Sequence, residues 1–296
     1  MTHRTSGHSM VEVLMSMTLG LLIIAALVTL VVQTTGLAQR QTDRFDLQQR
    51  ARVALDLMTR DLRIAGAGVD RGPVTGALSQ RFPAVWARRL GRSGDAPTVA
   101  RTNAFTVVAV PDTLAQTTTS GPIHASSSSL AVHAAVHCAA AMPACGFSAG
   151  TTLGVFDAAG GLSLWSAERV SGPLLTVRPL ATAGAPIDAG AVVAELLVRG
   201  YVHDSASRQL RYFDGDAPHQ PLIDGVDALI VRYFDADGEL PVAVFGDGPW
   251  LGSGETLFDA DLLRVRRVRV ELRLTVGRDT FRAAADVSPR NIGSQS

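Results

Sequence analysis

Apolar residues dominate one uninterrupted stretch near the start of the chain. From Val13 to Val32 no residue is charged. At a rise of about 1.5 Å per residue, about 20 such residues form a helix about 30 Å long, which matches the hydrocarbon core of a bilayer. The pattern predicts a membrane-spanning helix over residues 13–32. Glu12 stands directly before it, and an acid at that depth is costly unless it is paired.

The next stretch is amphipathic and continues the same helix. Apolar residues recur three or four positions apart, as expected for one buried face of a helix. They are Leu47, Ala51, Ala54, Leu55, Met58, Leu62 and Ala65. Gly66 and Gly68 follow as stop signals. We therefore expect one helix over residues 8–66, with its first half in the membrane and its second half packed on a head domain.

Residues 67–103 are rich in Gly, Pro and Arg and predict an irregular connection. From residue 104 the apolar pattern becomes that of strands separated by turns, so residues 104–296 predict a β-rich head. The expected strands are AFTVVAV, SLAVHAAV, TLGVF, LSLWSAERV, LLTVRPL, AVVAELLVRGYV, RQLRYF, ALIVRYF, PVAVF and RVRRVRVELRLTV. No second helix longer than two turns is evident. The predicted fold class is α+β, a long N-terminal helix with a mostly antiparallel sheet.

The last of these strands alternates apolar and charged residues, but its phase slips near Arg266 and Arg267. A β-bulge there would explain the slip. The arginine-bearing face permits two interpretations, a DNA-binding surface or a solvated face with acids on the neighbouring strand. The absence of interleaved aromatic residues favours the solvated face.

The residues Asp235, Asp237 and Glu239 resemble the start of a calcium-binding loop. The later ligands of such a loop are missing, so a hairpin turn is favoured.

Composition excludes several kinds of chemistry. The 27 basic residues are all arginine, which removes the P-loop lysine and lysine-based nucleophiles. The net charge is zero, so no global field attracts nucleic acid. No GxSxG, HExxH or GxGxxG motif is present. A carboxylate pair of the glycosidase kind stays open, and a membrane-tethered periplasmic enzyme is therefore an alternative function.

The two cysteines, Cys138 and Cys145, lie close together in HCAAAMPACG. A disulfide is favoured if the head lies outside the cytoplasm. Unpaired thiols are a second possibility. A zinc site with His133 and His137 is a third, although the spacing matches no zinc module. No metal or cofactor is expected.

The N-terminus permits three interpretations. A cleavable secretory signal would end near Gly36-Leu37-Ala38, but the apolar run is longer than usual for one. A plain signal anchor would leave Glu12 without a role. The third interpretation uses the order of residues: a short leader MTHRTSG with Arg4, then HSMV, then Glu12, then a long apolar helix.

That order resembles the prepilin N-terminus of type IV pilins and of type II secretion pseudopilins. The resemblance implies a leader over residues 1–7, cleavage between Gly7 and His8, and N-methylation of His8. His8 departs from the family, in which the first mature residue is usually Phe. The resemblance also gives Glu12 a partner, the N-terminal amine of a neighbouring subunit in the filament. Such a pair fixes the register of assembly.

Residues 51–68, 222–239 and the C-terminal strand resemble PilW-like minor pilins and J-type pseudopilins. The implied function is a minor pilin-like subunit of type IV pilus assembly, placed at or near the filament tip, and not an enzyme. A J-type pseudopilin of type II secretion is the alternative. The implied partners are the prepilin peptidase and methyltransferase, the major pilin, other minor pilins and the inner membrane, with no nucleic acid. The head would lie in the periplasm and reach the pilus fibre after assembly.

Overall fold

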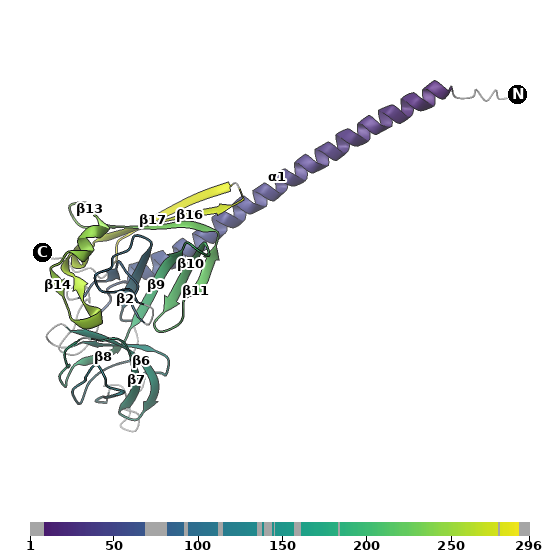
Figure 1. Cartoon of the computed structure of the whole chain (residues 1–296). Coiled ribbons are helices and arrows are strands. Elements are labelled where there is room, and N and C mark those ends of the chain that lie inside the picture. The colour runs from purple at the N-terminus through teal and green to yellow at the C-terminus, as the bar shows by residue number, and fades with distance from the viewer. Residues whose placement is uncertain are drawn as a thin grey trace. The chain divides into compact units, whose positions relative to one another are not determined.

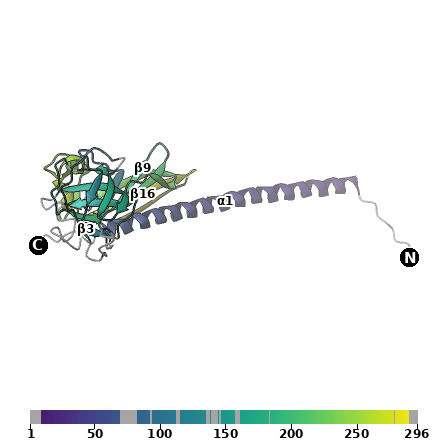
Figure 2. The ribbon, with the colours of Figure 1, turned by 90° about the horizontal axis from the view of Figure 1, so that it is seen from below.

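The computed structural model describes residues 9–68, 82–91, 94–111, 115–134, 138, 144, 146–156, 161–182, 184–277 and 279–289, with the backbone alone for 36–40. The chain divides into two compact units, Met1–Gln49 and Arg50–Ser296. Helix α1, Met10–Ile64, crosses the boundary between them and is drawn as one unbroken helix in Figure 2. The predicted helix over residues 8–66 is therefore present within two residues of each end.

The second half of α1 buries the face that the sequence pattern predicts. All seven predicted positions are at most 9 % exposed: Leu47, Ala51, Ala54, Leu55, Met58, Leu62 and Ala65. The helix ends where the glycines were expected to end it. Gly66 has a φ of 78°, which an L-residue with a side chain rarely adopts, and its N–H donates to the carbonyl of Val108.

The head is built from antiparallel sheets, and with α1 this gives the α+β class that was expected. The five-stranded sheet has the order β1 (Val85–Trp86), β2 (Ala104–Ala109), β9 (Leu197–Asp204), β10 (Gln209–Asp214) and β11 (Gln220–Asp224). The four-stranded sheet has the order β13 (Glu239–Leu240), β12 (Val226–Phe234), β16 (Arg267–Val276) and β17 (Asp279–Val287). In Figure 1, β16 and β17 run side by side as a long hairpin.

A six-stranded sheet has its own cluster of buried hydrophobic side chains. Its order is β3 (Gln116–Thr118), β8 (Val192–Glu195), β5 (Thr152–Phe156), β6 (Leu162–Ser171), β7 (Leu174–Ala181) and β4 (Ser129–Ala131). Leu153, Trp165, Leu175 and Val193 are among its buried side chains. The smallest sheet pairs β14 (Trp250–Leu251) with β15 (Phe258–Asp259). Short 3-10 turns complete the described elements: η2 (Val242–Gly246), η3 (Gly254–Thr256) and η4 (Ala260–Arg264).

Several sequence predictions need correction. PVAVF forms η2 and not a strand. The stretch 191–202 forms two strands, β8 and β9, which belong to different sheets. The connection over 67–103 is not irregular throughout, because Val85–Trp86 form β1 and both side chains are buried. The strand β17 was not expected as a separate element.

The predicted bulge near Arg266 and Arg267 is also wrong. The pairing of β12 with β16 runs in register from Phe234↔Arg267 to Ala228↔Arg273, and its register shift lies at the other end, between Val226 and Ala228. The phase slips because Ala260–Arg264 form η4 and not a strand, and Val265 at its C-cap is buried although it is out of phase with the buried residues of β16. Arg266 joins the two elements, and its backbone N–H donates to the carbonyl of Phe234 at 2.7 Å.

Candidate functional site

Glu12 lies in the first turn of α1 and its side chain is exposed. Its backbone N–H donates to the carbonyl of Ser9 at 2.9 Å, which closes the start of the helix. Among the residues that the structure describes, the Glu12 carboxylate has no hydrogen-bond or ion-pair partner. Gly7 and His8, the predicted processing site, lie outside the described residues.

The stretch Met10–Thr35 is long and apolar enough to cross a membrane, and none of it is buried. Its hydroxyl groups are satisfied within the helix. Ser16, Thr18 and Thr29, for example, each donate to a carbonyl three or four residues earlier. Glu12 is the one charged side chain in this stretch. By length and composition the segment fits a membrane anchor or a signal sequence.

A buried acid on α1 holds the helix to the five-stranded sheet, and the sequence analysis did not single it out. Asp61 is fully buried. Its Oδ1 accepts from Arg199 Nη1 at 2.9 Å and its Oδ2 accepts from the Tyr201 hydroxyl at 2.6 Å. Both donors lie on β9. The position of Asp61 between Met58 and Leu62 on the apolar face was the available signal that it would be buried.

The head also contains a polar pocket that no local sequence motif predicted. Its volume is about 650 Å³. It opens on the five-stranded sheet and on the loops beside it. The residues that line it are Arg89, Arg101, Asn103, Val202, His203, Asp204, Ser205, Arg211, Pro218 and His219. We refer to this set as the polar pocket.

Two of its arginines are clamped by a single buried carboxylate. The Asp95 side chain is 3 % exposed, and its carboxylate accepts from Arg89 Nη2 at 2.6 Å and from Arg101 Nη2 at 2.7 Å. The Nε atoms of the two arginines also donate to the Asp95 carboxylate, so both contacts are bidentate. Burial works against ionisation of the Asp95 carboxyl, but these hydrogen bonds outweigh it and hold its pKa well below the usual range.

His219 also lines the polar pocket, and its ring is held by a neighbouring aromatic side chain. Its ring stacks on Phe213 with centroids 4.9 Å apart and planes 17° apart. Phe213 in turn lies over Gly200, where a Cβ would come within 1.9 Å of the ring. Burial, together with the charges of Arg89 and Arg211, lowers the pKa of His219 below 6.5. This shift favours the neutral form of the ring.

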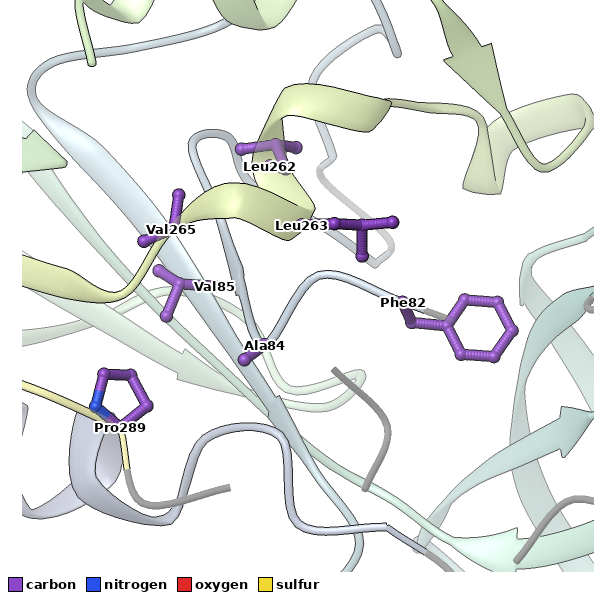
Figure 3. Close-up of a pocket in the computed structure, with 7 residues that line it drawn as sticks. All are labelled: Phe82, Ala84, Val85, Leu262, Leu263, Val265 and Pro289. Carbon is purple, nitrogen blue, oxygen red and sulfur yellow. The ribbon is translucent and has the colours of Figure 1, made fainter. Parts of the chain in front are cut away.

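A second, apolar pocket is a packing gap. Figure 3 shows its lining: Phe82, Ala84, Val85, Leu262, Leu263, Val265 and Pro289. Its volume of about 10 Å³ holds at most one water molecule. It offers no room for a ligand.

The calcium-loop sequence forms a hairpin turn, as predicted. β12 and β13 pair through Tyr233↔Leu240 and Phe234↔Glu239. Asp235 Oδ1 accepts from the N–H groups of Asp237 and Gly238, and its Oδ2 accepts from Arg264 at 2.6 Å. Both carboxylate oxygens of Asp235 thus accept hydrogen bonds from protein donors.

Three other acids, Asp247, Asp259 and Asp261, bring one carboxylate oxygen each within 4.8 Å of the others. Asp259 is buried, and both of its oxygens accept backbone N–H groups, from Asp261 and from Gly248. Its carboxylate therefore caps the η4 turn. This is a structural role and does not by itself define a catalytic or metal site.

The cysteines are only partly described. Cys138 is half-buried and disulfide-bonded. Cys145, together with His137, lies outside the described residues. The pairing of Cys138 with Cys145 stays a prediction, whereas the disulfide of Cys138 leaves no thiolate at this position for the alternative zinc site with His133.

The arginine face of β16 has the cross-strand acid that the sequence analysis expected. Arg267 and Arg269 each lie 3.7 Å from Asp286 of β17. The Arg267 guanidinium also lies over the Phe234 ring, 4.2 Å from its centroid. These contacts are typical of a solvated sheet face. The expectation that no nucleic acid binds stays a prediction.

Comparisons of the chain with protein-family models, with curated proteins and with solved structures find no match.

Proposed function

We propose that the chain is a minor pilin-like subunit of a type IV pilus. It is made as a membrane precursor, cut between Gly7 and His8, and methylated on the new amine of His8. Its apolar helix half then joins the helical core of a filament, at or near the tip. The proposal assigns no catalytic role to any residue. A J-type pseudopilin of type II secretion is the alternative within the same class.

One observation carries the proposal: α1 is a single helix of 55 residues whose first part is apolar and exposed, while its second part buries one apolar face. A helix that is apolar all round needs lipid or other helices around it. An uninterrupted continuation into the head gives a subunit that can leave the membrane while keeping its head attached. A cleaved secretory signal would have no reason to continue as a helix for about 30 further residues, which is two or three ordinary helix lengths.

Glu12 supplies the specificity of assembly in this proposal. Its exposed carboxylate is paired with the N-terminal amine of a neighbouring subunit inside the helix bundle. Opposite charges about 4 Å apart attract by about 4 kcal/mol at an effective dielectric constant near 20. Each charge alone in that environment is unfavourable. The pair therefore favours one axial register over its neighbours.

The decisive experiment is the mass and sequence of the mature N-terminus, on chain purified from membranes of its native host. The proposal expects a start at N-methylated His8. A start at Gln39 or at Met1 would contradict it. Gly7→Val should block the cut, whereas the matched change Gly36→Val should leave it unaffected. The opposite result would indicate an ordinary signal peptidase site near Gly36.

The pilus and the secretion alternatives differ in the machinery that takes up the subunit. Deleting the pilus assembly ATPase should remove the chain from the sheared extracellular fraction if it belongs to a pilus. Deleting the secretion ATPase should have no such effect. The reverse pattern would assign the chain to type II secretion.

A further inference from the structure

We propose that the polar pocket of the head binds an acidic sugar, that is, a sugar carrying a carboxylate or a phosphate group. This inference concerns the head alone and does not depend on how the N-terminus is processed. It rests on the charge, the free donors and the size of the pocket.

The charge of the polar pocket is positive on balance. Three guanidinium groups line it: Arg89, Arg101 and Arg211. Two carboxylates oppose them: Asp95 contacts Arg89 and Arg101 at 2.6 and 2.7 Å, and Asp204 lies 3.6 Å from Arg211. Because Asp95 is shared between two arginines, the formal sum of these groups is one positive charge. An anion is the ligand that this surplus attracts.

Donor groups in the polar pocket are left free and are held in place. Arg89 and Arg101 use Nε and Nη2 on Asp95. Within the described part of the chain, neither Nη1 atom has a hydrogen-bond partner. Because Asp95 fixes both guanidinium planes, the two Nη1 groups are already ordered before a ligand arrives. Binding then costs little side-chain entropy.

Arg211, on β10, is the third arginine of the polar pocket. Its Nη2 donates to the carbonyl of His219 at 3.0 Å, while its Nε is buried without a partner among the described residues. Its nearest acid, Asp204, is 3.6 Å away. The Asp204 carboxylate already accepts from the hydroxyl and N–H of Ser207 and from the N–H of Ala206. Arg211 is therefore only weakly neutralised.

The size and lining of the polar pocket indicate the rest of the ligand. A volume of about 650 Å³ is well above the space that one small oxyanion fills and lies in the range of about 300–1,000 Å³ of small-molecule sites. Asn103 and Ser205 offer an amide and a hydroxyl for neutral polar groups. Among the described residues, no aromatic ring other than the two imidazoles lines the pocket, so a stacked base is not favoured. A hydroxylated ring with one acidic group fits this lining.

The test measures binding to the full-length chain in detergent micelles, by titration calorimetry and ligand-observed NMR. The probes are glucuronate and glucose 6-phosphate, with glucose and inorganic phosphate as controls. We expect saturable binding of at least one acidic sugar, at least tenfold tighter than that of glucose and of inorganic phosphate. Binding of glucuronate alone would identify a carboxylated sugar, and binding of glucose 6-phosphate alone a phosphorylated one.

The variants are chosen so that the fold is preserved. Ser205 is exposed and makes no hydrogen bond through its side chain in the described structure. Ser205→Glu should weaken binding at least tenfold by repulsion, while the uncharged Ser205→Gln should change it by less than about threefold. Arg211→Gln should also weaken it at least tenfold. The matched change Arg282→Gln, on an exposed position of β17, should leave it unchanged.

Three results would overturn the proposal. One is the absence of saturable binding of either acidic sugar at concentrations of about 10 mM, beyond the range of even weak specific sites. A second is equal binding of glucose or of inorganic phosphate, which would remove the acidic group or the sugar from the recognition. The third is an unchanged affinity in Ser205→Glu, which would place the ligand elsewhere on the chain.

Discussion

The hydroxyl of Tyr201 donates a hydrogen bond to Oδ2 of Asp61 at 2.6 Å, although the two residues are 140 positions apart in the chain. Asp61 is fully buried, and its other oxygen accepts from Arg199. Burial and the neighbouring Asp61 charge raise the pKa of Tyr201, so the hydroxyl keeps its proton and stays a donor. The contact fixes the second half of α1 to β9.

Tyr201→Phe removes this donor and leaves one oxygen of a buried carboxylate unsatisfied. We expect the free energy of unfolding to fall by about 1.5–3 kcal/mol, as for hydrogen bonds to charged groups. Denaturant unfolding of the chain in micelles, followed by near-UV circular dichroism, measures it. Tyr212→Phe is the matched control, since the Tyr212 hydroxyl has no hydrogen-bond partner in the described structure. An equal loss in both variants would refute the role of the Asp61 contact.

Asp95 makes the head sensitive to acid. Its pKa in the folded chain lies below the ordinary value of 3.8 because Arg89 and Arg101 stabilise the carboxylate. The unfolded chain therefore binds the proton first, and this contribution to stability is present above pH 3.8 and is lost as the pH falls below it.

Asp95→Asn should lower the free energy of unfolding by about 1.5–3 kcal/mol at pH 7, because it removes the charged acceptor of hydrogen bonds from two partly exposed arginines. The difference from the unaltered chain should shrink as the pH falls below 3.8. Unfolding curves at a series of pH values measure both effects. Asp188→Asn, at an exposed position, serves as the control. It should neither lower the free energy of unfolding at pH 7 nor change its dependence on pH. A difference that is independent of pH would show that the Asp95 charge is not what stabilises the head.

His219 should titrate below its ordinary pKa of 6.5. It is faced by Arg89 and Arg211, by Asp95, and by the Phe213 ring. Since the folded chain takes up this proton at lower pH than the unfolded chain, the head should lose stability as the pH falls below 6.5. A histidine NMR titration measures the value, and His219→Gln identifies the signal.

The same titration also reports on the polar pocket. A bound acidic sugar places a negative charge near His219, so its pKa should rise when glucuronate or glucose 6-phosphate saturates the chain. Neutral glucose should leave it unchanged. A His219 signal that titrates at or above 6.5 in the free chain would contradict the burial and the arginine charges inferred for it.

Reduction of the chain tests the cysteine prediction. A Cys138–Cys145 disulfide predicts that each sulfur gains one hydrogen on reduction, which intact-mass spectrometry detects. Blocking with an alkylating reagent before reduction should label neither cysteine. Labelling of both before reduction would indicate free thiols. A metal site would instead show protection that a chelator removes without any reductant.

The buried face of α1 was predictable because a helix repeats every 3.6 residues and one stripe must be apolar. All of its predicted positions are buried. Asp61 lies on the same stripe but was missed. A single sequence shows that an acid falls on an apolar helix face, but its hydrogen-bond donors, Arg199 and Tyr201, are distant in the sequence, on β9. The burial of Asp61 depends on these tertiary contacts, which the helical pattern does not reveal.

The strands were predictable where a turn interrupts the apolar pattern, and less so elsewhere. β5, β6 and β7 appear where they were expected. The stretch 191–202 has a continuous pattern, but Leu196 separates β8 from β9, and its N–H donates to the carbonyl of Thr152. An alternating pattern gives the face that a residue occupies and not the sheet to which its strand belongs.

The polar pocket was the least predictable feature. Its residues come from the loop after β1, the approach to β2, and β9, β10 and the turn before β11. No two of its arginines share a local motif. Their convergence depends on the antiparallel pairing of β2, β9 and β10, which sequence periodicity does not determine.

Glu12 is central to the proposed function, and in the described structure its side chain is exposed and unpaired. Glu12→Gln keeps the size of the side chain and removes its charge. Membrane insertion should be unaffected, because an uncharged residue is easier to place in a bilayer. Incorporation into filaments should fall at least tenfold, since a buried amine in the neighbouring subunit would lose its counter-charge.

Quantitative immunoblotting of sheared filaments against the membrane fraction measures this ratio. Glu12→Asp retains the charge and should restore part of the incorporation, whereas a role based on side-chain size alone would not distinguish Asp from Gln in this way. Asp43→Asn removes an acid from an exposed position further along α1 and should leave the ratio unchanged. Normal filament content in Glu12→Gln would refute the ion pair, because no other charge in the apolar stretch Met10–Thr35 can take its place.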